Sequence, residues 1–144
     1  MPTQARESSH SPPVRRPRCF TATLGDGRPI EITPVGRGGP APTAFGEIGR
    51  TVARMAALDE ADAVRLGISV PAAWLARLAP ALGAGELGLA WFTTLVGTPE
   101  RAAAEVRLAR GAARAGLGPM LLDTVVLAAT ERGVTCLTVR LGDH

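Results

Sequence analysis

The sequence contains no lysine, asparagine or tyrosine, and only two histidines and two cysteines among its 144 residues. Cys19 and Cys136 are isolated and form no CxxC motif, so the sequence predicts no metal site. No apolar run approaches the ~20 residues that a membrane-spanning helix requires. The N-terminus has no apolar signal segment either, so we expect a cytoplasmic protein.

An excess of charge of one sign is also missing. All sixteen basic residues are arginine and thirteen residues are acidic, which leaves a net charge of only +3. Aromatic residues make up 3% of the chain and are not interleaved with the arginines, so the sequence argues against a nucleic-acid partner. The apolar fraction of 46% is enough for the core of one domain.

The chain divides into a short tail and this one domain, which occupies residues 19–144. Residues 1–18 are polar and rich in proline, so we expect a disordered N-terminal tail. Residues 20–24 and 29–33 are β-type runs on either side of an Asp-Gly turn at residues 25–27. This arrangement predicts a β-hairpin.

Residues 43–82 have a helical pattern in two or three pieces. The first piece is amphipathic, because an apolar residue recurs every three or four positions on one face. Pro71 is predicted to start a further helix, with Ser69 as its cap. The apolar face consists of Phe45, Ile48, Val52 and Met55 in the first piece, and of Trp74, Leu75, Leu78 and Leu82 in the helix after Pro71.

The last third of the chain predicts three strands and one helix. Residues 86–96 and 103–110 are expected to form antiparallel strands joined by a turn at residues 97–99. Residues 117–132 are expected to form a helix that ends at Gly133. Residues 134–141 then form a strand parallel to residues 103–110, with Cys136 as a small buried side chain.

The turn that opens this last helix is a candidate anion site. Gly116 and Gly118 remove side chains where a ligand must approach the main chain, and Pro119 suits a first helical turn. The free N–H groups and the helix dipole favour a diphosphate, to which Arg114 adds a charge. The alternatives are a plain tight turn without a ligand and a dinucleotide-binding turn, which normally has a longer glycine pattern.

Residues 116–123 (GLGPMLLD), together with the helix end and strand at residues 128–139, resemble the acyl-CoA signature of the GNAT superfamily of N-acetyltransferases. Residues 24–34 are similar to the first hairpin of the bacterial protein-acetyltransferase type. The resemblance implies an α/β fold with a mixed, mostly antiparallel sheet flanked by helices. It also implies a C-terminal parallel strand-helix-strand unit.

The same resemblance implies that the chain binds acetyl-CoA or another acyl-CoA and transfers the acyl group to an amine-bearing acceptor. The main chain of residues 106–110 would pair with pantetheine, and the two parallel strands would splay to admit the thioester. The cofactor-binding residues implied in this way are Val106, Leu108, Arg110, Arg114, Ala115, Gly116, Leu117, Gly118 and Pro119.

Transfer to an amine needs a base, for which Glu105 is the candidate. The alternative for Glu105 is an exposed carboxylate paired with Arg107. The chain departs from the family at Ala113, where the family has arginine or glutamine. It also has no tyrosine, the family's common general acid, and it stops before the family's last helix and strands.

These departures leave other interpretations open. The alternative to an acyl-CoA-dependent N-acyltransferase is a catalytically silent GNAT-like module that binds acetyl-CoA or a protein partner in a regulatory role. A degenerate fragment is a third interpretation. The unpaired edge expected at residues 134–141 predicts a homodimer through that edge.

Overall fold

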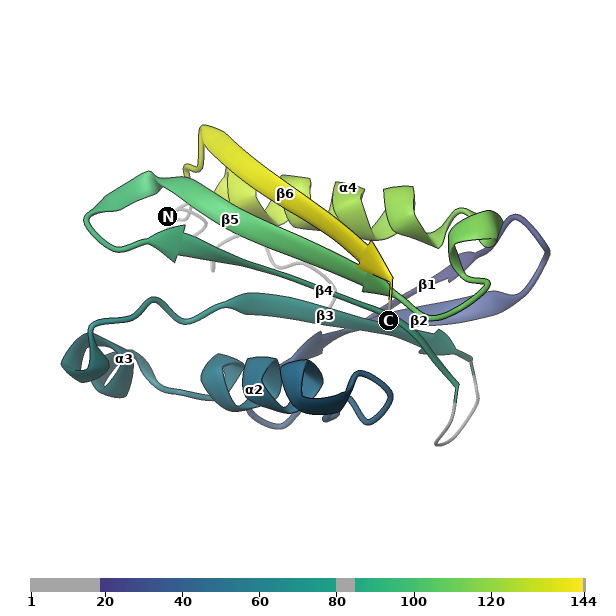
Figure 1. Ribbon diagram of the computed structural model, residues 1–144, viewed down its shortest axis with the longest axis horizontal. Coiled ribbons are helices and arrows are strands. Elements are labelled where there is room, and N and C mark those ends of the chain that lie inside the picture. The colour runs from purple at the N-terminus through teal and green to yellow at the C-terminus, as the bar shows by residue number, and fades with distance from the viewer. Residues whose placement is uncertain (1–18, 80–84, 144) are drawn as a thin grey trace, which may run out of the picture.

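The computed structural model describes residues 19–79 and 85–143, and these build one six-stranded sheet with helices on both faces (Figure 1). The strands are β1 (Phe20–Thr23), β2 (Pro29–Val35), β3 (Ala72–Leu78), β4 (Glu86–Leu95), β5 (Thr98–Leu108) and β6 (Cys136–Asp143). The helices are α2 (Gly46–Ala56), α3 (Glu60–Leu66) and α4 (Leu117–Glu131), and a short 3₁₀ turn, η1 (Ala113–Ala115), precedes α4.

The strands lie in the sheet in the order in which they occur in the chain. All neighbouring pairs are antiparallel except β5 and β6, which are parallel because α4 connects them. The predicted α/β fold class, with its mostly antiparallel sheet and C-terminal parallel strand-helix-strand unit, is therefore confirmed at this level.

Each face of the sheet has its own core, because alternate residues of a strand point to opposite faces. On one face α4 packs against β4 and β5, and Leu117, Leu121 and Val125 are fully buried there. On the other face α2 covers β3, and Phe45 and Val52 are buried against it. In Figure 1 α4 accordingly lies on the side of the sheet opposite to α2 and α3.

The predicted hairpin forms, and its turn contacts η1, directly before α4. The Asp26 carboxylate accepts hydrogen bonds from the Arg28 main-chain N–H at 3.1 Å and from Arg28 Nε at 2.8 Å. The main-chain hydrogen bond, more than any other interaction, lowers the pKa of Asp26 below its ordinary value. Next to it, Gly25 N–H donates to the Ala115 carbonyl at 2.8 Å, so the hairpin turn supports η1.

The helix predicted to start at Pro71 is wrong, because residues 72–78 form the central strand β3. Ala73 and Leu75 are buried in the core under α2, while Trp74 and Ala76 face the core under α4. A strand that is apolar on both faces loses the alternation that identifies strands, and alanine, leucine and arginine then imitate a helix. Ser69 caps no helix, and Leu82 lies outside the described residues.

The first predicted helix forms as α2, and a buried carboxylate holds its start. Glu86, on β4, is 8% exposed, and its oxygens accept hydrogen bonds from Thr43 N–H and Ala44 N–H at 2.9 and 2.8 Å. The Thr43 hydroxyl donates a third hydrogen bond at 3.1 Å. This carboxylate ties the loop before α2 to the sheet.

The end of α4 follows the prediction closely. Gly133 has φ 87°, its N–H donates to the Thr130 carbonyl, and Val134 N–H donates to the Ala129 carbonyl, both at 3.0 Å. This is a Schellman ending, in which glycine supplies the left-handed residue. Among the helices that the structure describes, none is long and apolar enough to span a membrane.

The prediction that Cys136 is buried is wrong, because its side chain is exposed. Cys136 begins β6, which is the last strand of the sheet. Its neighbour Leu137 instead packs against the core under α4. Since α2 and α3 lie over the other half of the sheet (Figure 1), the face on which Cys136 lies is open to solvent.

Candidate functional site

The glycine turn lies directly before α4, where the sequence predicts it. Gly116 has φ 87°, a left-handed conformation that favours glycine, and α4 begins directly after it. Pro119 lies in the first turn of the helix, as expected. Gly118 has a packing role as well, because a Cβ atom there would lie 3.3 Å from Leu108 Cδ1.

The main-chain donors of this turn are only partly open. The N–H groups of Ala115 and Gly116 each donate to a carbonyl three residues back, at 3.2 and 3.3 Å. The N–H groups of Leu117 and Gly118 occupy the first two helical positions, where an α-helix supplies no acceptor, and no side chain caps them. The expected ring of free donors is therefore reduced to these two groups.

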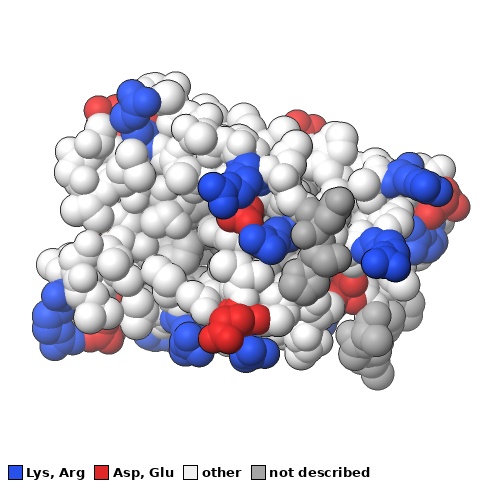
Figure 2. Space-filling view, viewed as in Figure 1, with Lys and Arg blue, Asp and Glu red and all other residues white. Residues whose placement is uncertain are grey.

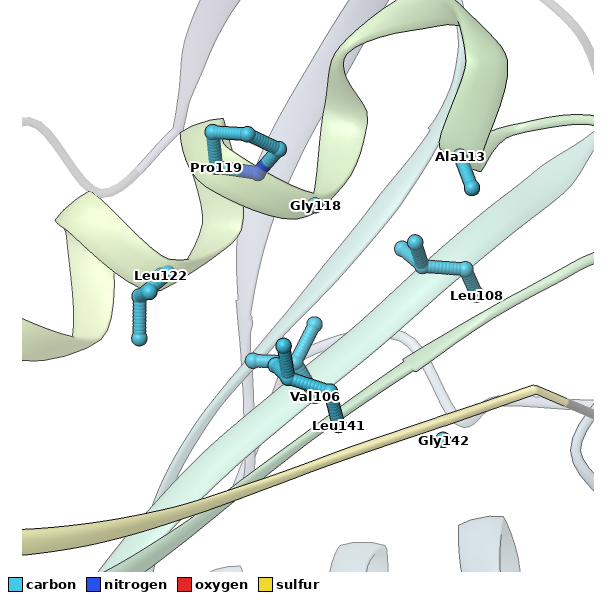
Figure 3. A pocket seen from close by; sticks show the side chains of 8 residues that line it. All are labelled: Val106, Leu108, Ala113, Gly118, Pro119, Leu122, Leu141 and Gly142. Carbon is cyan, nitrogen blue, oxygen red and sulfur yellow. The ribbon is translucent and has the colours of Figure 1, made fainter.

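A cavity of about 440 Å³ lies directly beside these donors. It is open to solvent on one side and bordered by the start of α4, by η1 and by the two parallel strands β5 and β6 (Figure 3). The residues that line it are Val106, Leu108, Ala113, Gly118, Pro119, Leu122, Leu141 and Gly142.

The lining of this cavity is almost entirely apolar. Figure 3 shows the side chains of Val106, Leu108 and Leu141 between the two strands and the helix, with Leu122 on the helix side. No ionisable side chain lines it. An apolar chain can therefore lie in the cavity, with polar groups of a ligand at its helix end.

Two arginines flank the turn on the outside of the cavity. Arg110 and Arg114 are both exposed, and neither has an ion-pair partner within residues 19–79 and 85–143. On the face seen in Figure 2, charged side chains lie in small groups of both signs rather than in one basic patch. These two guanidinium groups are thus free to bind an anion placed at the start of α4.

The predicted cofactor residues separate into three sets. Val106, Leu108, Gly118 and Pro119 line the cavity. Ala115 and Leu117 are instead buried in the core under α4, so only their main chain faces the turn. Gly116, Arg110 and Arg114 lie around the turn without lining the cavity.

Four lining residues were missed by the sequence reasoning: Ala113, Leu122, Leu141 and Gly142. The available signal was the parallel pairing of residues 103–110 with residues 134–141. That pairing places Leu141 directly beside Val106, so a residue opposite a predicted lining residue was itself a candidate.

The splay expected between the parallel strands is not present. β5 and β6 stay in register from Arg101 and Cys136 to Leu108 and Asp143. Val106 and Leu108 are also paired with β4 on the other side, and β5 ends at Leu108, before Arg110. The main chain of β5 is therefore occupied on both edges, and pantetheine has no free strand to pair with in this conformation.

A second hollow of about 240 Å³ lies on the opposite face of the same strands. Trp91, Glu105 and Arg140 are direct partners across β4, β5 and β6 and line it side by side. The other residues that line it are Thr93, Ala103, Ala104 and Thr138. This hollow combines an aromatic ring, a carboxylate and a guanidinium group.

The candidate base Glu105 is paired with Arg107, as the alternative interpretation predicts, but it is half-buried rather than exposed. Its Oε2 accepts a hydrogen bond from Arg107 Nε at 2.6 Å, and its side chain is 16% exposed. Glu105 lines the second hollow and does not line the cavity beside α4. The structure therefore does not bring the candidate base and the candidate cofactor cavity together on one face.

The two hollows nevertheless lie back to back across β5 and β6. Glu105 and Val106 are consecutive in β5, and their register partners Arg140 and Leu141 are consecutive in β6. Glu105 and Arg140 line one hollow, while Val106 and Leu141 line the other. The paired main chains of β5 and β6 therefore separate the apolar cavity from the polar hollow.

No three His, Cys, Asp or Glu side chains within the described part of the chain are close enough to hold a metal ion. Cys19 is exposed, with its Sγ 3.5 Å from Thr33 Oγ1. In comparisons with known proteins, no family model and no curated protein matches this chain.

Proposed function

We propose that this chain binds an acyl-CoA beside the start of α4 and transfers its acyl group to an amine. The observation that carries the proposal is the apolar cavity between α4, β5 and β6, which opens next to two main-chain donors and two exposed arginines. The resemblance of residues 116–123 to the GNAT acyl-CoA signature supports the same interpretation.

The start of α4 suits the diphosphate of an acyl-CoA, and the apolar cavity suits its acyl-bearing arm. The N–H groups of Leu117 and Gly118, at the positive end of the helix dipole, favour a diphosphate. Arg114 adds a charge-assisted hydrogen bond from the adjacent turn. The apolar lining provided by Val106 and Leu141 accommodates the acyl-bearing arm.

Acyl-CoA supplies an acyl group that is activated as a thioester. In the transfer, the amine nitrogen bonds to the acyl carbon, the carbon–sulfur bond breaks, and the sulfur leaves as a thiolate. Glu105 accepts the proton that the attacking ammonium must lose, and Arg107 holds the Glu105 carboxylate in place. In this proposal, solvent protonates the thiolate.

This chemistry requires the two hollows to join. Glu105 faces the polar hollow and the cavity lies behind it, so β6 must part from β5 near Leu108 and Asp143 when the arm enters. The amine then approaches from the polar hollow, where it meets the Trp91 ring and the Glu105 carboxylate beside the Arg140 guanidinium group.

A second candidate function is binding of acyl-CoA without transfer, in a regulatory role. The continuous pairing of β5 with β6 favours this alternative, because it keeps Glu105 away from the cavity. The two candidates share the cavity and differ only in whether the strands part.

Calorimetry with acetyl-CoA and with desulfo-CoA tests the shared part of the proposal. Binding of both ligands with one site per chain is expected, and no heat with either ligand would exclude both functions. Release of free thiol in the presence of a panel of amines then separates transfer from silent binding. Glu105→Gln should slow thiol release at least tenfold while the affinity for desulfo-CoA stays the same.

A further inference from the structure

The outer edge of β6 has no strand partner in the part of the chain that the structure describes. β6 is the last strand of the sheet and pairs only with β5. The N–H and C=O groups that alternate residues of Cys136–Asp143 direct away from β5 are therefore open to another strand. The edge also carries exposed apolar surface, because Leu141 is 67% exposed.

β6 has few of the usual protections of an edge strand, its charged residues being Arg140 and, at its end, Asp143. It contains no proline and no lysine, and its pairing with β5 shows no register shift that would mark a bulge. The opposite edge of the sheet is formed by β1, which is only four residues long. The two edges thus differ, and only β6 offers a long, regular strand.

We propose that a second copy of this chain pairs with this edge, β6 against β6, in an antiparallel arrangement around a two-fold axis. Such an axis, perpendicular to the sheet, keeps the α4 side of both copies on one face. The apolar face of β6 in one copy then meets the apolar face of β6 in the other; this face carries Leu137, Val139 and Leu141. The polar faces, which carry Cys136, Thr138 and Arg140, also meet each other. The partner strand must be apolar on one face and polar on the other, and β6 meets that requirement itself.

The charge on β6 selects one register. An axis through Arg140 places two arginines directly opposite each other, which like-charge repulsion disfavours. An axis through Thr138 pairs only residues 136–140 of the strand, whereas an axis through Val139 pairs residues 136–142. The Val139 register also sets Arg140 opposite Thr138 and Leu141 opposite Leu137 of the second copy.

This register has a consequence for the cavity beside α4. Leu141 lines that cavity, and Leu137 of the second copy would cover the exposed side of Leu141. The inference about pairing does not depend on any ligand, since it rests on the open edge, the pattern of its faces and the position of Arg140. An interface of one strand pair is small, so we expect a dissociation constant on the order of 10 μM.

Disulfide trapping tests the register directly. Val139→Cys, in a chain that also carries Cys19→Ser and Cys136→Ser, should form a disulfide dimer on mild oxidation. Directly opposed residues of antiparallel strands have Cα atoms about 4.5–5.5 Å apart, within the range of a disulfide. Val96→Cys is the matched control, because Val96 is 68% exposed and lies in the turn between β4 and β5; it should stay monomeric.

Sedimentation tests the pairing without a new cysteine. The unmodified chain should form dimers in the micromolar range, and Leu141→Lys should shift the midpoint at least tenfold upward while its far-ultraviolet circular dichroism stays native. A chain that is monomeric at 200 μM overturns the proposal. So does a dimer that Leu141→Lys leaves unchanged, or one that Val96→Cys traps as well as Val139→Cys does.

Discussion

Glu105 and Val106 are consecutive residues of β5, yet their side chains line two different hollows on opposite faces of the sheet. Val106 faces the apolar cavity beside the start of α4, and Glu105 faces the polar hollow with Trp91 and Arg140. The proposed function assigns the ligand's apolar arm to the first hollow and the attacking amine to the second. Each element of that assignment can be tested by itself.

Filling the cavity should abolish binding without affecting the fold. Ala113 lines the cavity from η1 and is exposed, so Ala113→Trp places an indole over the apolar lining at little cost in stability. We expect the affinity for acetyl-CoA in calorimetry to fall at least tenfold. Ala61→Trp is the matched control, since Ala61 is an exposed residue of α3; equal losses in both variants would contradict the location of the site.

Removing the guanidinium group of Arg114 should weaken binding through the phosphates. Arg114→Ala is expected to lower the affinity for acetyl-CoA about three- to tenfold, as for a solvent-exposed, charge-assisted hydrogen bond. The loss should shrink as salt is added. Arg101→Ala, which removes an exposed arginine near the start of β5, should leave the affinity unchanged, and an equal effect there would indicate nonspecific attraction.

Locking β5 to β6 should separate binding from transfer. Arg107 and Gly142 are register partners at the end of the strands near the cavity, so Arg107→Cys combined with Gly142→Cys allows a disulfide across them. In the oxidised form we expect thiol release to stop, and in the reduced form to return to the level of the Arg107→Cys single variant, which also lacks the partner of Glu105.

The matched lock is Ala103→Cys with Thr138→Cys, a pair closer to the middle of the strands. It joins the same strands without closing the end that must part, so thiol release should persist in its oxidised form. If the lock at residues 107 and 142 leaves thiol release unchanged, the strands do not need to part.

The carboxylate of Glu86 should contribute to stability rather than to binding. Glu86→Ala removes the acceptor for Thr43 N–H and Ala44 N–H, and we expect the free energy of unfolding to fall by about 1–3 kcal/mol. Glu86→Gln keeps one acceptor oxygen and should lose less. Urea unfolding measures both, and Glu100→Ala, at an exposed position, should change the free energy of unfolding little.

Much of the fold could be predicted from local patterns. The hairpin, α2, the strands β4 to β6 and α4 with Gly133 at its end follow from turn residues and periodicity. β3 could not be predicted in this way, because burial of Trp74 and Leu75 on opposite faces removes the alternation on which strand prediction depends. The exposure of Cys136 depends on which half of the sheet the helices cover, and that is a tertiary property.

Several residues of the candidate site could be identified from the sequence, but their arrangement in space could not. The turn at Gly116 and the start of α4 follow from residues 114–119 alone. The cavity also needs Leu141 and Leu122, whose places depend on strand register and helix packing. The position of Glu105 on the far face follows from simple alternation with Val106, yet its separation from the cavity depends on β6 remaining paired.

The most direct test of the account is a two-dimensional NMR titration of the isotope-labelled chain with acetyl-CoA. The account predicts that the amide signals of Leu117, Gly118, Leu141 and Gly142 shift together and saturate with one binding constant. Shifts confined to another part of the chain, such as the loop at residues 36–39 that lines a separate hollow, would contradict it. So would the absence of any shift at millimolar ligand.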